Sequence, residues 1–134
     1  MNAPSEDIKD ILEAVSSLAL TFATDLFVSE IPVDAPADTA CVAIFDTGGE
    51  DPEMNYTYER PHVQVLVRGA KSGYREGHEL AQAIRDSLIA TYDEEVNGAR
   101  YVGIWCMGDV NFIAYDDNRR PLFTVNFRLH RTTA

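Results

Sequence analysis

The 134-residue sequence has few of the features that place a protein in a membrane or outside the cell. It has no run of the roughly 18 or more apolar residues that a membrane-spanning helix needs. Near the N-terminus, Glu6, Asp7 and Asp10 stand where a secretory signal carries basic residues, so we expect no such signal. The two cysteines, Cys41 and Cys106, lie in separate apolar runs and form no CxxC pair. This pattern predicts buried, reduced thiols of a cytosolic protein.

Basic residues are almost absent from the first part of the chain. Residues 1–59 contain thirteen acidic residues and one basic residue, whereas residues 60–134 contain nine acidic and ten basic residues. The formal net charge of the whole chain is −11. Because such a charge repels the phosphates of nucleic acid, we do not expect the domain to bind nucleic acid. The uneven charge suits head-to-tail self-assembly or a charged partner, and it is equally compatible with acids that only keep the surface soluble.

Motifs for catalysis, cofactors and metals are also missing. The chain has no GxSxG nucleophile elbow, no GxxxxGK[ST] phosphate loop and no GxGxxG dinucleotide motif. The acidic residues of 46–53 lack the spacing of a calcium loop, and the three histidines form no ligand pair at helical spacing. We therefore expect no enzymatic activity, no cofactor and no metal site, and a structural or interaction protein.

Hydrophobic periodicity predicts two helices. Apolar residues recur at three- and four-residue steps over residues 8–19, which predicts a helix over about residues 6–20 with Ser5 as its cap. A second apolar stripe over residues 80–88 predicts another helix, for which Ser72 is the candidate cap.

Strand signals fill much of the remaining sequence. The predicted strands cover residues 26–28, 41–45, 62–69, 101–107, 111–115 and 122–131. Alternation over 62–69 and 122–131 predicts one buried face on each strand. The predicted inward residues are Val63, Val65, Val67, Phe123, Val125, Phe127 and Leu129, and Arg128 and His130 are among the outward residues of the last strand. The strand at 101–107 is apolar on both faces, with Tyr101, Trp105 and Met107 on one of them. Such a strand is either central or covered by a neighbouring subunit. The order of elements predicts a single α+β domain over residues 1–134, in which two α-helices pack on a mainly antiparallel sheet.

Two polar segments are candidate contact surfaces. The predicted loop Thr47–Pro61 is long, and structureless links of this length are usually functional or disordered. The charged turn at 116–121 contains two arginines, which can pair either with the two preceding aspartates or with acids of another subunit. Together with the two-faced strand, these segments supply the candidate interface residues: Tyr56, Tyr58, Arg60, Trp105, Arg119 and Arg120.

Five segments, in this order and spacing, carry a resemblance to a known family: Asp25–Pro32, Asp46–Gly49, Glu59–Val65, Ala83–Leu88 and Arg120–Arg128. Together they resemble the phage minor capsid or tail terminator family, the tail-to-head joining proteins of long-tailed bacteriophages and prophages. The resemblance covers most of the chain.

What this resemblance implies is a tail-terminator-like α+β subunit of the virion that forms a ring, usually six-fold. Such a ring caps the tail tube, ends its polymerisation and offers a face to the head-completion or neck proteins. Genomic DNA passes through its lumen without specific binding. The implied partners are copies of the chain, the tail tube protein and the neck proteins, with assembly in the host bacterial cytoplasm and no membrane contact. The family contributes no catalytic residue.

The predicted contacts follow from this implication. Subunits would meet through Trp105 and through Arg119 and Arg120 facing acids of the neighbour, while Tyr56 and Tyr58 would touch the tube. Other interpretations remain open: another head-completion or neck connector, an acidic DNA mimic that inhibits a DNA-binding enzyme, and a small hydrolase.

Overall fold

The computed structural model describes residues 1–53 and 58–133. In these residues, two α-helices, α1 (Pro4–Ala14) and α2 (Tyr74–Ile89), and a short 3-10 helix, η1 (Ser16–Leu18), pack against one sheet. The sheet has six strands: β1 (Leu26–Val28), β2 (Cys41–Gly49), β3 (Pro61–Arg68), β4 (Tyr92–Val96), β5 (Ala99–Tyr115) and β6 (Pro121–Thr133). No helix within the described ranges is long and apolar enough to cross a membrane.

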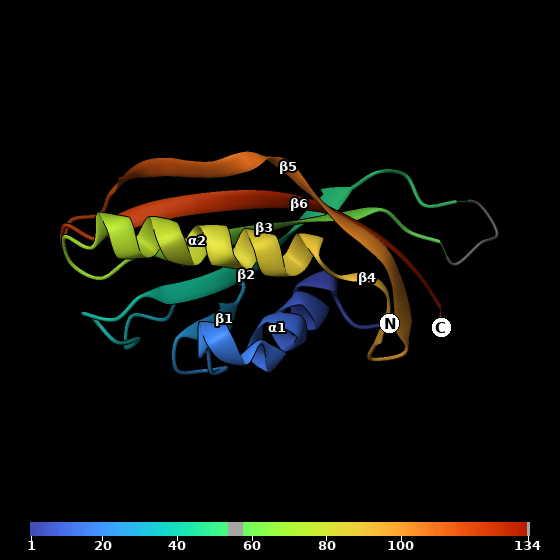
Figure 1. The fold of residues 1–134 in the computed structure, drawn as a ribbon, viewed down its shortest axis with the longest axis horizontal. Helices are drawn as coiled ribbons and strands as arrows, with labels where there is room; N and C mark the ends of the chain where they lie inside the picture. The colour runs from blue at the N-terminus through green and yellow to red at the C-terminus, as the bar shows by residue number, and fades with distance from the viewer. Residues whose placement is uncertain (54–57, 134) are drawn as a thin grey trace.

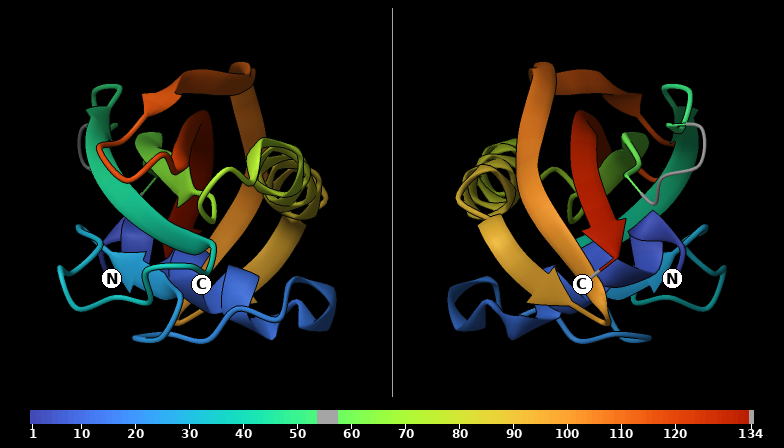
Figure 2. Two further views of the ribbon diagram at one scale, coloured as in Figure 1. Left: turned by 90° about the vertical axis from the view of Figure 1, so that its left-hand side faces the viewer. Right: turned by 90° about the vertical axis from the view of Figure 1, so that its right-hand side faces the viewer.

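The sheet is curled, and its strand order is β1-β2-β3-β6-β5-β4. Strand β1 pairs parallel with β2, and the other neighbouring strands are antiparallel. Both helices lie on the inner side of the curl, with α2 running along β6 and α1 below it (Figures 1 and 2). This arrangement confirms the predicted α+β class and the mainly antiparallel sheet with two packed helices.

The core lies between the helices and the inner face of the sheet. It is built by the alternating residues that the sequence placed inward on β3 and β6 and by the apolar stripes of the two helices. These residues are fully buried: Ile8, Leu12, Val63, Val65, Val67, Ala81, Ile84, Leu88, Phe123, Val125, Phe127 and Leu129. Alternation on the strands and helical spacing on α1 and α2 therefore located the core correctly.

The helix boundaries differ from the prediction. Helix α1 begins at Pro4 because proline is well suited to the first helical position, where its missing N–H is not needed. It ends at Ala14, since Val15 is extended and two serines follow. Ser5 is not the cap. Its backbone N–H and Oγ donate to the Asp46 carboxylate on β2, at 2.9 and 2.6 Å.

The second helix also begins differently from the prediction, and the β2–β3 loop is shorter than predicted. Gly73, not Ser72, is the residue before α2, and Ser72 has a positive φ of 57°. Strand β2 continues past Phe45 to Gly49, so the connection to β3 starts three residues later than expected.

The strands of the C-terminal half differ from the prediction in two ways: an edge strand was missed, and two predicted strands are one continuous strand. The acidic segment β4 was missed, and the Asn97–Gly98 turn joins it to β5 with both φ values positive. The predicted strands at 101–107 and 111–115 are parts of the single strand β5, which contains three register irregularities.

One of these irregularities corrects the predicted faces of β5. Tyr101 pairs with Arg131 and Gly103 with His130, so Val102 is an extra, bulged residue. Tyr101 is therefore fully buried on the inner face, while Trp105 lies on the opposite face and is 40% exposed. A second correction concerns the thiols. Both cysteines are free, but Cys41 is buried whereas Cys106 is only half-buried.

Candidate interaction surface

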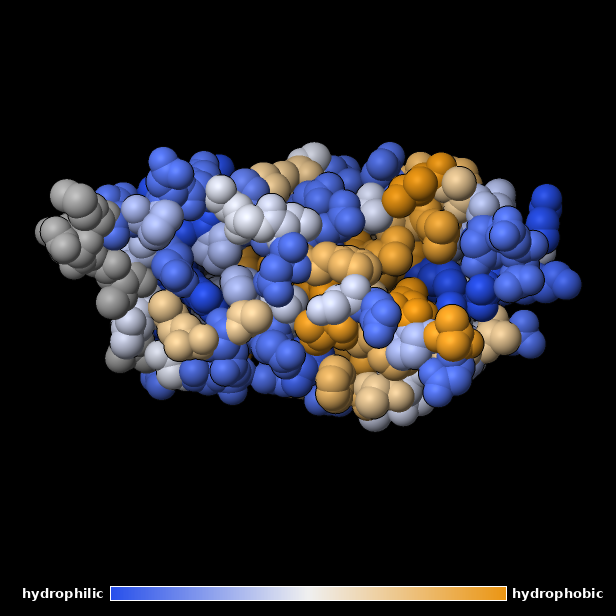
Figure 3. Space-filling model, turned by 180° about the vertical axis from the view of Figure 1, so that it is seen from behind, coloured by the Kyte–Doolittle hydropathy of each residue, from blue (hydrophilic) through white to orange (hydrophobic). Residues whose placement is uncertain are grey.

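The side of the sheet that points away from the helices, which we call the outer face, is the candidate surface. Register places Leu66 of β3 between Ala43 and Thr124 on this face, and Met107 of β5 opposite Asn126. Figure 3 shows this side of the molecule, where hydrophobic side chains gather on the half away from the residues drawn in grey. The helices leave this face open, so it is available for a partner.

The segment 29–40 covers the β1–β2 end of the outer face. Phe27, Cys41 and Ala43 are buried there, with Ile31 and Ala35 packed against them. Arginine side chains hold this segment through its backbone: Arg68 donates to the carbonyl of Pro36 at 2.7 Å, and Arg120 to that of Ala37 at 3.3 Å. The segment is therefore held in place. Among the residues that the structure describes, it does not extend over the outer face of β3, β6 and β5.

Four side chains on the uncovered part, Tyr58, Trp105, Arg128 and His130, form what we call the Trp105 cluster. The Tyr58 hydroxyl lies 2.8 Å from Nδ1 of His130. The His130 and Trp105 ring centroids are 4.4 Å apart, and Cζ of Arg128 lies 5.2 Å from the Trp105 ring centroid. The cluster is ordered by these contacts, and Trp, Tyr and Arg are the residue types that dominate binding energy at protein interfaces.

Glycine at position 103 makes room for the Trp105 ring. A Cβ built on Gly103 would lie 2.8 Å from the far edge of that ring. The indole therefore lies over Gly103 of its own strand and contacts the His130 ring on the paired strand, while it remains partly exposed. A ring fixed in this way loses little side-chain freedom when a partner covers it.

The Trp105 cluster carries the positive charge of Arg128. Within the described residues, Arg128 has no carboxylate within 4.0 Å, and its buried Nε has no hydrogen-bond partner. Burial lowers the pKa of His130 below its ordinary value, and the neighbouring charges of Arg128 and Arg60 act in the same direction. The unpaired guanidinium of Arg128 is therefore the feature that a carboxylate of a partner would meet.

The structure brings some of the predicted interface residues together. Tyr58 and Trp105 both contact His130, which links the predicted loop to the predicted two-faced strand. Arg60 lies nearby but already binds Glu50 and Glu53, at 3.0 and 2.9 Å. Tyr56 lies outside the described residues. Sequence reasoning missed Arg128 and His130 as candidates, although the alternation of β6 placed both on its outward face.

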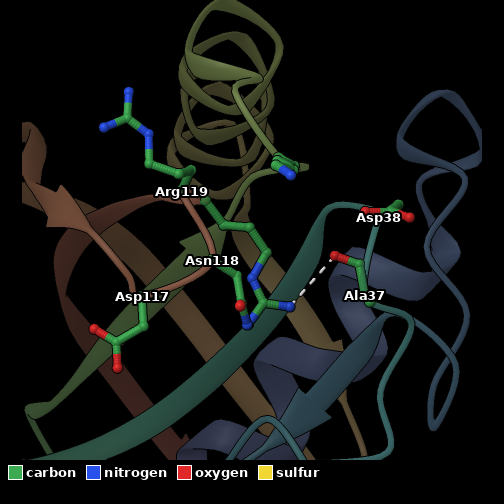
Figure 4. Close-up of a pocket in the computed structure, with 7 residues that line it drawn as sticks. Ala37, Asp38, Asp117, Asn118 and Arg119 are labelled. Carbon is green, nitrogen blue, oxygen red and sulfur yellow. Dashed lines mark hydrogen bonds between the residues drawn. The ribbon is translucent and has the colours of Figure 1, made fainter.

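Arg119 and Arg120 lie elsewhere, at a pocket of about 370 Å³ that is lined by Ala37, Asp38, Lys71, Asp117, Asn118, Arg119 and Arg120. Arg120 is committed inside the chain, because its Nε donates to Asp116 at 2.8 Å. The Arg119 guanidinium lies over the Tyr115 ring, 5.2 Å from its centroid. Figure 4 shows the Arg119 side chain pointing away from Ala37 and Asp38. The two arginines thus face different surroundings.

No group of three or more His, Cys, Asp or Glu side chains in the described ranges is arranged to hold a metal ion. What the outer face presents is an aromatic group held by internal contacts, beside an arginine whose Nε has no hydrogen-bond partner among the described residues.

Comparison with known proteins gives this surface a context. A family model described as bacteriophage tail terminator protein matches residues 14–133. No curated protein matches. A solved chain titled as part of the virion of a native gene transfer agent particle is 16% identical, with a TM-score of 0.74, and the alignment covers 97% of this chain and 95% of that one. Another solved chain, also 16% identical, has a TM-score of 0.54 and is covered over 91% of its length.

The structural matches show that the whole curled sheet with its two helices is a known fold. The family match extends from the end of α1 to the last described strand and so includes every residue of the Trp105 cluster. The chain therefore belongs to the bacteriophage tail terminator family, and it is a structural protein of the phage tail.

Proposed function

We propose that copies of this chain form a closed ring, six-fold as the family resemblance implies, that caps the phage tail tube. The ring ends tube polymerisation and offers its other face to the head-completion or neck proteins. The observation that carries the proposal is the family match over residues 14–133. The uncovered outer face with its unpaired Arg128 supports it, since a subunit that acts by assembly needs an open, complementary surface.

The charge of the chain supports a lumen through which DNA passes without binding. With a net charge of −11, the assembled ring repels phosphates more than it attracts them. The proposed partners are copies of the chain, the tube protein and the neck proteins. The likeness to a chain of a virion particle supports a place in the virion. The proposed site of assembly is the host cytoplasm, as the family resemblance implies.

Removing the chain from an assembling phage tests this function. Particles made without the chain are expected to carry tails of abnormal length that are not joined to heads. Tail lengths are measured by negative-stain electron microscopy. Supplying the wild-type chain from a plasmid serves as the control and should restore a narrow length distribution. Joined particles with normal tails in the absence of the chain would rule the proposal out.

A further inference from the structure

The outer face has a positive group, Arg128, that forms no ion pair with any described residue. At the β1 edge of the sheet, acidic side chains also lack ion-pair partners in this part of the structure. Segment 29–40 lies beside the edge strand β1 and contains Glu30, Asp34 and Asp38 but no basic residue. Arg68 and Arg120 hold this segment through backbone carbonyls only. Glu30 and Asp34 consequently form no ion pair within the described part of the chain.

A tight turn in this segment presents an apolar and an acidic side chain together. The turn Pro32–Ala35, which we call the Val33 turn, is closed by a 3.0 Å hydrogen bond from the Ala35 N–H to the Pro32 carbonyl. Val33 and Asp34 are its central residues, and Val33 is fully exposed, at 107%. A side chain of this kind, held on a closed turn, needs little ordering before it binds.

We propose that the Val33 turn of one copy docks on the Trp105 cluster of a second copy of this chain. Val33 packs against the exposed indole of Trp105, and the Asp34 carboxylate faces the guanidinium of Arg128. The inference rests on the proposed ring, because it names the contact between neighbouring copies in it. The two surfaces are complementary in charge and in hydrophobicity. On one copy the unpaired Arg128 lies beside the Trp105 ring, and on the other the unpaired Asp34 lies beside the exposed Val33 side chain.

The positions of the two surfaces determine what kind of assembly this contact builds. The Val33 turn lies at the β1 edge, whereas the Trp105 cluster lies on β5 and β6, with β2 and β3 between them. Because different patches of the same chain meet, the contact is head-to-tail. An open assembly therefore has a free Val33 turn at one end and a free Trp105 cluster at the other. When these two ends meet, the assembly closes into a ring.

Charge reversal on each side of the contact tests the inference. We expect Arg128→Glu and Asp34→Arg each to weaken self-association by about tenfold or more, because like charges then face each other. The double variant restores opposite charges and should associate like the wild type. Arg75→Glu and Glu79→Arg, which make the same charge changes at exposed positions of α2, are the matched controls. Molecular mass is followed by sedimentation velocity over a concentration series.

Two outcomes of this experiment overturn the inference. The first is that both single variants associate like the wild type. The second is that the double variant remains as weak as the weaker of the two single variants, since a specific pair must be restored by the swap.

Cross-linking covers the case in which the isolated chain associates too weakly for sedimentation. Val33→Cys in one preparation is mixed with Met107→Cys in another, both in a Cys106→Ser background, and a short bis-maleimide is added. Met107 lies on the outer face two residues from Trp105, and Cys41 is fully buried and does not compete. We expect cross-linked pairs in the mixture but not in either preparation alone. A yield no higher than with Glu79→Cys in place of Val33→Cys overturns the inference.

Tail-length measurements separate failure of this inference from failure of the proposed function. If the wild-type chain sets tail length but Arg128→Glu copies also form rings and set it normally, the contact is wrong and the ring function stands. If Arg128→Glu abolishes length control while the association of copies is unchanged, the outer face binds the tube or neck protein, which also overturns the inference.

Discussion

Tyr101 donates a 2.6 Å hydrogen bond to the carboxylate of Asp7, which lies 94 residues earlier in the chain. Asp7 stands in the first turn of α1 and is fully buried. The Asp7 carboxylate also accepts hydrogen bonds from Nδ2 of Asn97, at 2.9 Å, and from Nη1 of Arg131, at 3.3 Å. Burial and the bond to Asp7 raise the pKa of Tyr101 above its ordinary value. One buried carboxylate thus ties the N-terminal helix to β5, β6 and the β4–β5 turn.

Replacing Asp7 by Ala is expected to lower the free energy of unfolding by about 3 kcal/mol, because the buried Tyr101 hydroxyl loses its acceptor and the buried Arg131 loses one of its two carboxylate partners. Urea denaturation measures the loss. Asp10→Ala is the control: it removes an acid of the same helix whose side chain is 38% exposed, and it should cost well under about 1 kcal/mol. Equal costs for the two variants would contradict the assigned role of Asp7.

Asp116 organises the turn between β5 and β6 and gives the protein a pH-dependent contribution to stability. It accepts hydrogen bonds from the backbone N–H groups of Asn118 and Arg120, both at 2.9 Å, and from Nε of Arg120. Burial opposes its charge, but these bonds hold the pKa of Asp116 below its ordinary value of 3.8. A carboxylate with a lowered folded-state pKa stabilises the fold above its unfolded pKa, and this contribution is lost as pH falls through the folded pKa.

Asp116→Asn is therefore expected to be less stable than the wild type by about 1 kcal/mol near neutral pH. The difference should shrink as the pH falls below 3.8, because the wild-type carboxyl then becomes protonated too. Urea denaturation at about pH 7 and about pH 3 measures both values. Asp117→Asn controls for the loss of one charge in the same turn. A difference that stays constant between the two pH values would contradict this account.

Most of the fold could be predicted from periodicity alone. Alternation placed Val63, Val65 and Val67 in the core, and helical spacing did the same for Ile84 and Leu88. These signals are strong because each element has one buried face, and a shift by one residue in a strand would expose all of its apolar side chains. Helix ends were predicted less well, since Ser5 and Ser72 have the chemistry of caps but serve other roles here.

The candidate surface could be predicted only in part. The sequence named Trp105 as an interface residue and assigned Tyr101 to the same face of the strand. The structure places Trp105 on the outer face, 40% exposed, and Tyr101 on the inner face, fully buried. The bulge at Val102 reverses the alternation between them. The neighbouring Gly103 was an available signal that the prediction did not use, because a glycine inside a strand often marks a bulge. His130 and Arg128 become candidates only when pairing of β5 with β6 brings them beside Trp105, which is a long-range relationship.

Arg119 and Arg120 are expected to respond differently to substitution. Arg120→Ala should cost about 1 kcal/mol in unfolding free energy, because Arg120 binds Asp116 and the Ala37 carbonyl. Arg119→Ala should cost about 0.5 kcal/mol or less, since it loses only an exposed contact with the Tyr115 ring. Thermal or urea unfolding measures both costs, and a larger cost for Arg119→Ala would contradict the assignment.

This difference decides which arginine can test a subunit contact. Charge reversal at Arg120 disturbs the turn itself, so a loss of assembly in that variant has two explanations. Arg119→Glu leaves the turn intact and isolates the contact. If Arg119 faces an acid of a neighbouring copy, this variant should associate more weakly at unchanged stability. Association like that of the wild type would remove Arg119 from the interface.

Gly103→Ala is expected to displace the Trp105 ring without unfolding the protein. The new Cβ would lie 2.8 Å from the edge of the indole, so the ring must shift from its present position against His130. We expect a stability cost of about 1 kcal/mol. Because the chain has a single tryptophan, its emission spectrum reports this movement directly. Self-association should weaken in parallel, since the displaced ring no longer presents the surface that docks Val33.

The matched control for this variant is Gly77→Ala in α2. There the new Cβ would lie 2.9 Å from the Phe123 ring, so the core receives a similar disturbance in a region that Trp105 does not contact. Gly77→Ala should change stability while leaving the tryptophan emission and the association of copies as in the wild type. If Gly103→Ala shifts the emission but copies still associate normally, the position of the indole does not matter for docking. The contact must then be made by other residues of the outer face.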